Sequence, residues 1–385
     1  MSINLDKRYL IETLQQLVQI NSVNPMLVPG APGEEEIGAF LAQALRTMNL
    51  EPEIDRLEPG RVNVTGILKG SGGGRSLMIN AHMDTVGVHN MEDPFSASIS
   101  DGRLFGRGAQ DMKGSIAATL TMIKAIVENK TELKGDLIIA FVADEEYGSI
   151  GTERLLEKYQ TDASIVTEPT ELDICLAHMG FGLFEFITTG KAAHGGRPKE
   201  GIDANIHMGR VLAELDGLSQ KLRDSSPHPL LGIPSLHIPV INGGSEPFTY
   251  AETCKMQLER RTLPGETLGE VLSEFNTIIK KLSAQDDTFK ATIKPVLWRD
   301  PYESNKTNKI VTALFDSVRD VTGREPSYIG HSWWEDSGLI GKSGIDTVII
   351  GPKGAGLHTS KEWVDIQSVL DLAGILLKVT MKFCS

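Results

Sequence analysis

Apolar runs of strand length alternate with helical patterns along the first part of the chain, and this alternation limits the folds open to it. The runs RVNVTGILKG, SLMINAH, GDLIIAFVA and ASIVTE are typical of strands, and SIAATLTMIKAIVEN carries apolar residues at helical spacing. Strands that alternate with helices pair mostly in parallel, and the connecting helices cover both faces of the sheet. The sequence therefore predicts an α/β fold built on a mostly parallel sheet.

The pattern changes near residue 175 and returns near residue 295. The segment between them contains FGLFEFITTG, the long helical pattern DANIHMGRVLAELDGLSQKL and the strand-like CKMQLERRTLP, which are typical of a smaller α+β unit. A chain of 385 residues is also long for a single core. We therefore predict a discontinuous domain formed by residues 1–175 and 295–385, with residues 176–294 as an inserted domain.

Charge and composition exclude several classes of protein. The formal net charge of −13 lacks the basic footprint that nucleic-acid binding needs. No apolar run approaches the ~18 residues of a membrane span, and the amino-terminal segment lacks a signal-peptide pattern. The three cysteines share no metal or redox spacing. These features predict a cytoplasmic protein that binds neither nucleic acid nor membrane.

Acids and imidazoles follow the predicted strands at the points where those strands end. The chain carries such groups at His82, Asp84, Glu145, Glu146, Glu168 and His358, with Asp111 just before a helix. The carboxyl ends of parallel strands meet at one edge of an open sheet, so we expect these groups to lie together. Their like charges would repel one another unless a cation lay between them.

Imidazole and carboxylate ligands favour zinc, with cobalt or manganese as substitutes. A shared carboxylate would hold two such cations ~3.5 to 4 Å apart. His82 is then expected to bind metal, and Asp84 is expected to orient the His82 ring through its second nitrogen.

Each of these motifs alone has an ordinary explanation. A histidine two residues before an aspartate is commonly a satisfied loop residue, adjacent glutamates commonly form a solvated turn, and an aspartate commonly begins a helix. The joint placement of the motifs favours a metal centre. A metal-binding protein without catalysis, acting as an interaction module, and a metal-free amino-acid-binding protein are the alternatives from other classes.

Nine motifs follow one another in an order that resembles one enzyme family. They are HMDTV, GRGAQDMKG, DEEYGSIG, TEP, KAAHGGRP, INGG, RRTLPGE, EDSGL and GLHTSKEWV. They are similar to the metallopeptidase family that includes acetylornithine deacetylase, succinyl-diaminopimelate desuccinylase, aminoacylases and glutamate carboxypeptidases. The resemblance covers essentially the whole chain, and the motif set is specific for the family but not for a substrate.

The resemblance implies a ligand set for two zinc ions in each chain. It implies one zinc held by His82 and Glu168, a second held by Glu146 and His358, and Asp111 as the ligand that bridges both. Cobalt or manganese would be substitutes for zinc at these sites.

The resemblance also implies the catalytic residues. Glu145, beside a ligand but not itself one, is assigned as general base, and Asp84 supports the site from behind His82. A water whose pKa the metals lower toward ~7 can give its proton to such a carboxylate, which later passes it to the leaving amine. The implied reaction is hydrolysis of an amide bond.

The inserted domain is implied to act as a dimerisation or lid domain, so the resemblance predicts a homodimer. His194 of the AAH motif is implied to reach the partner's active site and to stabilise the oxyanion. Arg261 matches an arginine that binds a substrate carboxylate, and Asn242 and Gly243 of the INGG motif match further substrate contacts.

Two departures from the family pattern leave the substrate open. Phe248 and Thr249 stand where many deacylases carry an asparagine that holds substrate. Trp333 and Trp334, in a segment that replaces a more usual Thr-Asp-Ala neighbourhood, are either packing anchors or an apolar pocket wall. We predict hydrolysis of an N-acyl amino acid of the acetylornithine or succinyl-diaminopimelate kind. A metallo-dipeptidase or carboxypeptidase of the same family is the close alternative.

Overall fold

A central β-sheet organises the first of two units in the computed structural model, which describes residues 4–385. Unit 1 comprises the chain up to Leu176 together with Ser304–Ile329 and Glu335–Ser385. Unit 2 comprises Ala177–Glu303 and Gly330–Trp334. Within residues 4–385, no helix is both long enough and apolar enough to cross a membrane.

Four parallel strands form the centre of this sheet, in the order β6 (Leu137–Val142), β3 (Leu77–His82), β7 (Ala163–Val166) and β15 (Asp346–Ile349). The flanking strands are β1 (Glu53–Glu58) and β2 (Arg61–Leu68) beyond β6, and β8 (Ile174–His178), β13 (Tyr302–Glu303) and β14 (Tyr328–His331) beyond β15. Every residue of β3 and β6 is buried, as expected for strands covered on both faces. The predicted α/β class is confirmed, with antiparallel strands added at the edges of the parallel core.

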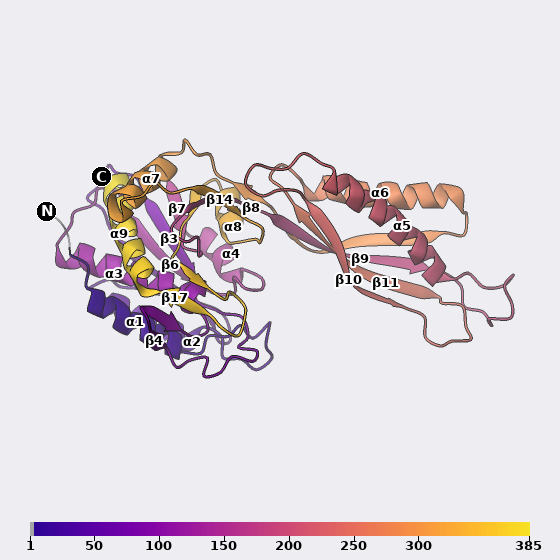
Figure 1. Cartoon of the computed structure of the whole chain (residues 1–385), viewed down its shortest axis with the longest axis horizontal. Coiled ribbons are helices and arrows are strands. Elements are labelled where there is room, and N and C mark those ends of the chain that lie inside the picture. Colours follow the sequence, from indigo (N-terminus) through magenta and orange to yellow (C-terminus); the bar gives the residue numbers. More distant parts are fainter. Residues whose placement is uncertain (1–3) are drawn as a thin grey trace. The chain divides into compact units, whose positions relative to one another are not determined.

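Helices cover both faces of the central sheet. On one face, α4 (Ile150–Leu156) and α8 (Ser337–Lys342) place Leu155 and Ile340 against the strands. On the other face, α3 (Gly114–Glu128) and α9 (Ile366–Phe383) pack against each other (Figure 1). The remaining helices of unit 1 are α1 (Lys7–Gln19) beside α3, α2 (Glu35–Thr47) against β2, and α7 (Lys309–Thr322) beside α9. Helix α3 is buried almost all round, which explains its nearly continuous apolar sequence.

A small sheet joins distant parts of unit 1. Its strands, in order, are β16 (Gly354–Ala355), β17 (Trp363–Asp365), β5 (Arg103–Phe105) and β4 (Ser98–Ser100). Between β5 and α3 the chain forms a short irregular turn, η1 (Ala109–Lys113). The pairing of β5 with β17 therefore brings this turn next to the segment around residue 362.

Unit 2 contains one antiparallel sheet with two helices over one face (Figure 1). The strands, in order, are β10 (Ser235–Gly243), β11 (Thr253–Thr262), β9 (Gly180–Thr189) and β12 (Lys290–Arg299), and the helices are α5 (Ala204–Arg223) and α6 (Leu268–Gln285). Residues of β9 and β11 alternate between buried and more exposed positions, and Phe184, Phe186 and Met256 belong to the core that the helices cover. This alternation buries Arg260 and turns Arg261 to the opposite face.

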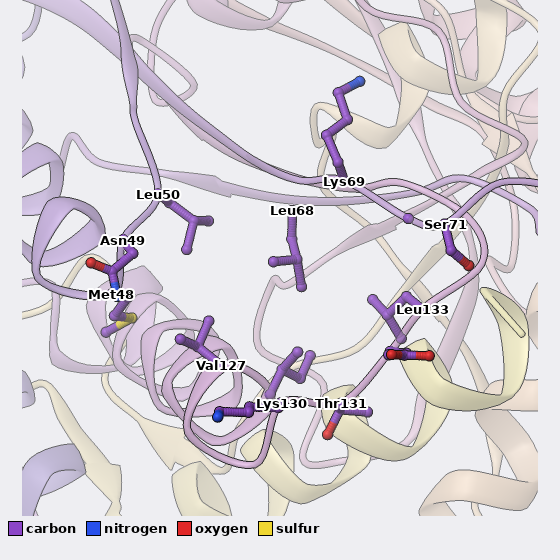
Figure 2. A pocket seen from close by; sticks show the side chains of 13 residues that line it. Met48, Asn49, Leu50, Leu68, Lys69, Ser71, Val127, Lys130, Thr131 and Leu133 are labelled. Carbon is purple, nitrogen blue, oxygen red and sulfur yellow. The ribbon is translucent and has the colours of Figure 1, made fainter.

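A cavity of about 580 Å³ opens in unit 1 between the ends of α2 and α3 (Figure 2). Its lining includes the apolar side chains of Leu50, Leu68, Val127 and Leu133. Leu68 pairs with Leu137, the first residue of β6. The cavity therefore lies at the sheet edge opposite the carboxyl ends of the parallel strands, ~17 Å away along β6.

Candidate metal centre

The parallel strands of unit 1 bring the predicted acids and imidazoles to one edge of the sheet. His82 is the last residue of β3, Glu145 and Glu146 follow the end of β6, and Glu168 follows the end of β7. Pairing aligns His82 with Val142 at the end of β6, and Asn80 of β3 with Val166 at the end of β7. The ends of β3 and β6 are therefore level, and β7 ends two residues earlier, so that Glu168, two residues beyond Val166, comes level with His82.

Asp111 lies between two imidazoles. Its Oδ1 lies 2.9 Å from Nε2 of His82, and its Oδ2 lies 3.3 Å from Nε2 of His358. Oε1 of Glu168 lies 3.5 Å from the same nitrogen of His82, and Oε2 of Glu146 lies 3.2 Å from the same nitrogen of His358. The structure thus brings together two histidine–glutamate pairs that share one aspartate.

The donor atoms in this centre suit a divalent cation. The group His82, Glu145 and Glu168 and the group His82, Asp111 and Glu146 each offer ligand atoms that all lie within 4.8 Å of one another. Oε1 of Glu146 is buried and has no hydrogen-bond partner within the part of the chain that the structure describes. A buried carboxylate oxygen without a donor is costly unless a cation satisfies it. Nitrogen and carboxylate ligands of this kind are those of zinc and related metals.

The electrostatics of the centre also favour the binding of positive charge. Burial and the nearby Glu168 carboxylate hold the pKa of Glu145 well above its ordinary value. Burial and the nearby Asp111 do the same to the pKa of Glu168 and raise the pKa of Glu146. Carboxylates crowded in this way resist ionisation together, and bound cations would relieve their repulsion.

Metal binding should release protons from this centre. Hydrogen bonds to Asp111 and Glu146 raise the pKa of His358 to about 10, so its ring is protonated at neutral pH in the metal-free protein. A protonated ring has no lone pair for a metal, so the affinity for a divalent cation should rise with pH up to about 10, the pKa of His358. Calorimetric titration in two buffers of different ionisation enthalpy measures the proton release. A pH-independent affinity without proton release would contradict this arrangement.

Asp84 contacts His82 in a different way from the expected one. Nδ1 of His82 lies 3.0 Å from the main-chain oxygen of Asp84 and 3.7 Å from its Oδ1. The Asp84 carboxylate instead accepts hydrogen bonds from the main-chain N–H of Glu145 at 3.1 Å and of Glu146 at 3.3 Å. The main-chain carbonyl therefore orients the ring, because the carboxylate is occupied in holding the turn that carries both glutamates.

Sequence reasoning missed a buried network behind this turn. Arg61 donates to both carboxylate oxygens of Glu34, at 2.7 and 2.9 Å, and to Oδ1 of Asp144 at 2.7 Å. Nδ2 of Asn24 donates to both Asp144 and Asp84. The one available signal was an arginine at the start of an otherwise buried strand, since a buried arginine needs acidic partners.

The predicted substrate contacts in unit 2 fall into two separate places. Asn242 and Gly243 pair with Lys255 and Cys254, near the start of β11, whereas Arg261 pairs with Ser235 near its end. The distance between the two places is ~20 Å along the strand, so one small molecule cannot contact both within one chain. His194 is exposed in the loop that follows β9, and its Nδ1 accepts a hydrogen bond from the main-chain N–H of Gly196 at 3.0 Å.

Arg261 and the two tryptophans have partners within unit 2. Arg261 forms an ion pair with Glu259, and its guanidinium lies 5.2 Å from the centre of the Phe181 ring. Nε1 of Trp334 donates to the main-chain oxygen of Asp300 at 3.1 Å, which makes Trp334 a packing anchor. Trp333 stacks on His331 and remains 41% exposed, so it is the one of the two that is available to a ligand.

Comparisons with known proteins identify the family and similar folds. The family model described as Peptidase family M20/M25/M40 matches residues 78–382. The chain is 29% identical to N-formyl-4-amino-5-aminomethyl-2-methylpyrimidine deformylase of Bacillus subtilis, covering 93% of this chain and 91% of the relative. It is 27% identical to acetylornithine deacetylase of Myxococcus xanthus, covering 97% of each chain. A dinuclear metal-binding M20 peptidase from Bacillus subtilis shares the fold with a TM-score of 0.76 at 16% identity, covering 98% of each chain.

Proposed function

The chain belongs to peptidase family M20/M25/M40, a family of hydrolases that act on amide bonds, and from this membership we propose that it is a two-zinc amidohydrolase of N-acyl amino acids. The family resemblance indicated by the motifs is thereby confirmed. The observation that supports two metals is the position of Asp111, whose two carboxylate oxygens face two different histidines. In this proposal His82 and Glu168 would hold one zinc, Glu146 and His358 would hold the other, and Asp111 would be shared by both. Cobalt or manganese would substitute for zinc.

Glu145 is the proposed general base. Its main-chain N–H donates to Asp84, and its half-buried carboxylate lies among the ligand groups, within 4.8 Å of atoms of His82 and Glu168. A carboxylate in this position suits a group that takes up and returns a proton beside the metals. When bound, the cations would supply Lewis acidity and lower the pKa of a water toward about 7. The Glu145 carboxylate would accept a proton from the attacking water and deliver it to the departing amine nitrogen.

The names of the relatives favour removal of an acyl group from nitrogen. One relative is named a deformylase and another a deacetylase. We therefore propose a deacylase of the acetylornithine or succinyl-diaminopimelate kind. The second candidate is a peptidase, because the same centre would hydrolyse a peptide bond and the similar structures include a metallo-carboxypeptidase from Sulfolobus solfataricus.

We propose that residues 1–175 and 295–385 form the catalytic domain and that residues 176–294 form a dimerisation or lid domain. Strand β10 is at an edge of the sheet in unit 2, and Val240 and Ile241 on it are 41% and 46% exposed. An exposed apolar edge strand favours pairing with another chain. This edge supports a homodimer, in which His194 of one protomer would serve the active site of its partner.

Metal content and amide hydrolysis, measured on the same purified protein, test the proposed function. The protein would be assayed with and without added zinc or cobalt against N-acetyl and N-succinyl amino acids, dipeptides and an N-formyl amine. About two metals per chain and chelator-sensitive release of amine are expected. A preference for acyl amino acids would indicate a deacylase, and a preference for dipeptides would indicate a peptidase. Bound metal without turnover of any member would favour a non-catalytic metal-binding protein, and purified protein that binds no zinc would favour a metal-free binding protein.

Two inactive variants should restore activity when they share a dimer. The His194→Ala variant lacks the oxyanion donor, a loss of about 10²- to 10³-fold in kcat, and the Glu145→Gln variant lacks the base. If His194 acts on the partner's site, co-expressed variants form mixed dimers with one intact site, which gives about a quarter of wild-type activity. Steady-state assays of each variant alone provide the control. A mixture as inactive as its components would show that His194 does not act across the dimer.

A further inference from the structure

Two motifs far apart in the sequence meet beside the metal centre. Trp363 of β17 pairs with Phe105 of β5, and the N–H of Gly106 donates to the main-chain oxygen of Glu362 at 3.2 Å. The segment GRGAQDMKG, which carries Asp111, therefore lies against the segment GLHTSKEWV, which carries His358.

The Glu362 side chain is 1% exposed and is surrounded by donors from the Asp111 loop. Its Oε2 accepts from Nη1 of Arg107 at 2.6 Å and from the N–H of Gly108 at 2.9 Å. Its Oε1 accepts from the N–H of Gln110 at 2.9 Å and from that of Asp111 at 3.1 Å. One carboxylate thus holds the main chain from Gly108 to Asp111, the segment that presents Asp111.

The turn before Asp111 requires a glycine at position 108. Gly108 has a φ of +80°, and a Cβ at this position would lie 2.7 Å from Cγ2 of Thr85. Only glycine fits this backbone without strain. Glycine at position 108 therefore allows the tight turn in which the main-chain N–H donates to Glu362.

Arg107 extends the same contact to the His358 loop. It is 1% exposed, and it donates through Nη2 to the main-chain oxygen of Thr359 at 2.8 Å and through Nε to that of Gly87 at 3.2 Å. Thr359 directly follows His358, whose own side chain is 54% exposed. The Arg107–Glu362 pair therefore joins the two loops that carry Asp111 and His358.

We propose that Glu362 is a positioning residue, which with Arg107 holds Asp111 and His358 in place for metal binding; this inference rests on the proposed metal-dependent function. The carboxylates around Asp111 repel one another before cations arrive, so a loop without such a clamp would move outward. A buried ion pair adds little net stability compared with apolar packing, but its directional hydrogen bonds fix a geometry. Residues that orient metal ligands typically control metal affinity.

The Glu362→Gln variant tests the proposal with little change in volume. An amide presents N–H groups on one side, so it cannot accept from both the Arg107 side and the Asp111 side. Competition between the metal-free protein and a chelator for Co²⁺ should show a dissociation constant raised about 10- to 100-fold. The absorption spectrum of the bound Co²⁺ should also change, because it reports the ligand geometry.

The matched control is Glu266→Gln, which removes one charged partner of a buried arginine in unit 2. Glu266 pairs with Arg260, whose side chain is fully buried. This variant should lower the melting temperature of the metal-free protein and leave Co²⁺ affinity and spectrum as in wild type. If the Glu362→Gln variant keeps the wild-type Co²⁺ affinity and spectrum, Glu362 is not a positioning residue, whatever the melting temperature of the variant.

Arg107→Lys provides an independent variant should Glu362→Gln fail to fold. Lysine keeps the positive charge but lacks the second guanidinium nitrogen, which donates to Thr359. The variant should therefore weaken Co²⁺ binding mainly at one of the two sites, the one that includes His358. Wild-type Co²⁺ affinities at both sites of Arg107→Lys would overturn the proposal. A wild-type protein that binds no Co²⁺ would instead overturn the proposed function itself, which separates the two failures.

Discussion

Replacing Glu145 with glutamine is expected to lower kcat by about 10²- to 10⁴-fold while the metal content stays that of wild type. Glutamine has the size of glutamate but cannot take up a proton at neutral pH. Asp84 accepts a hydrogen bond from the main-chain N–H of Glu145 and does not contact its carboxylate through this bond. The side chain can therefore be changed without removing the contact that fixes the turn.

Metal analysis and steady-state kinetics on the same preparation check this prediction. Glu132→Gln is a suitable control, because Glu132 lies in unit 1 at the cavity on the opposite sheet edge. It should behave as wild type in both measurements. If Glu145→Gln keeps more than about a tenth of wild-type kcat, the assignment of the general base is wrong. If it loses metal as well, Glu145 acts as a ligand.

The Asp111→Asn variant should lose both metals. The two oxygens of Asp111 face His82 and His358 separately, and an amide leaves only one oxygen to accept a cation's charge. We expect metal content after gel filtration to fall from about two per chain to nearly none, and activity to fall with it. Metal analysis by mass spectrometry and the Co²⁺ competition assay measure this directly.

His358→Ala provides the comparison for Asp111→Asn. His358 contacts only the Asp111 and Glu146 carboxylates of the centre, so its loss should remove about one metal and leave the other at the His82 and Glu168 group. Two metals retained in Asp111→Asn, or the same loss in both variants, would contradict a bridging role for Asp111.

The sequence alone was enough to predict the sheet and the edge at which the site forms. Strand and helix periodicity are local properties, and the parallel order of strands follows from their alternation with helices. Since side chains just beyond parallel strands must share one edge, the convergence of His82, Glu145 and Glu168 follows without any knowledge of tertiary contacts. The structure confirms the α/β class, and the family match confirms the resemblance.

Hydrogen-bond partners, by contrast, were decided only by the tertiary structure. The Asp84 carboxylate holds the Glu145 turn and leaves the His82 ring to a main-chain carbonyl, which no residue spacing indicates. Arg107 and Glu362 are 255 residues apart and meet only because β5 pairs with β17.

The separation of Arg261 from Asn242 likewise depends on register, since a strand pattern gives the face of a residue but not its position along the partner. Local periodicity thus determined which elements form and which edge carries charge. The tertiary structure determined which groups are in contact, because hydrogen-bond partners come from segments that are far apart in the sequence and meet only through packing.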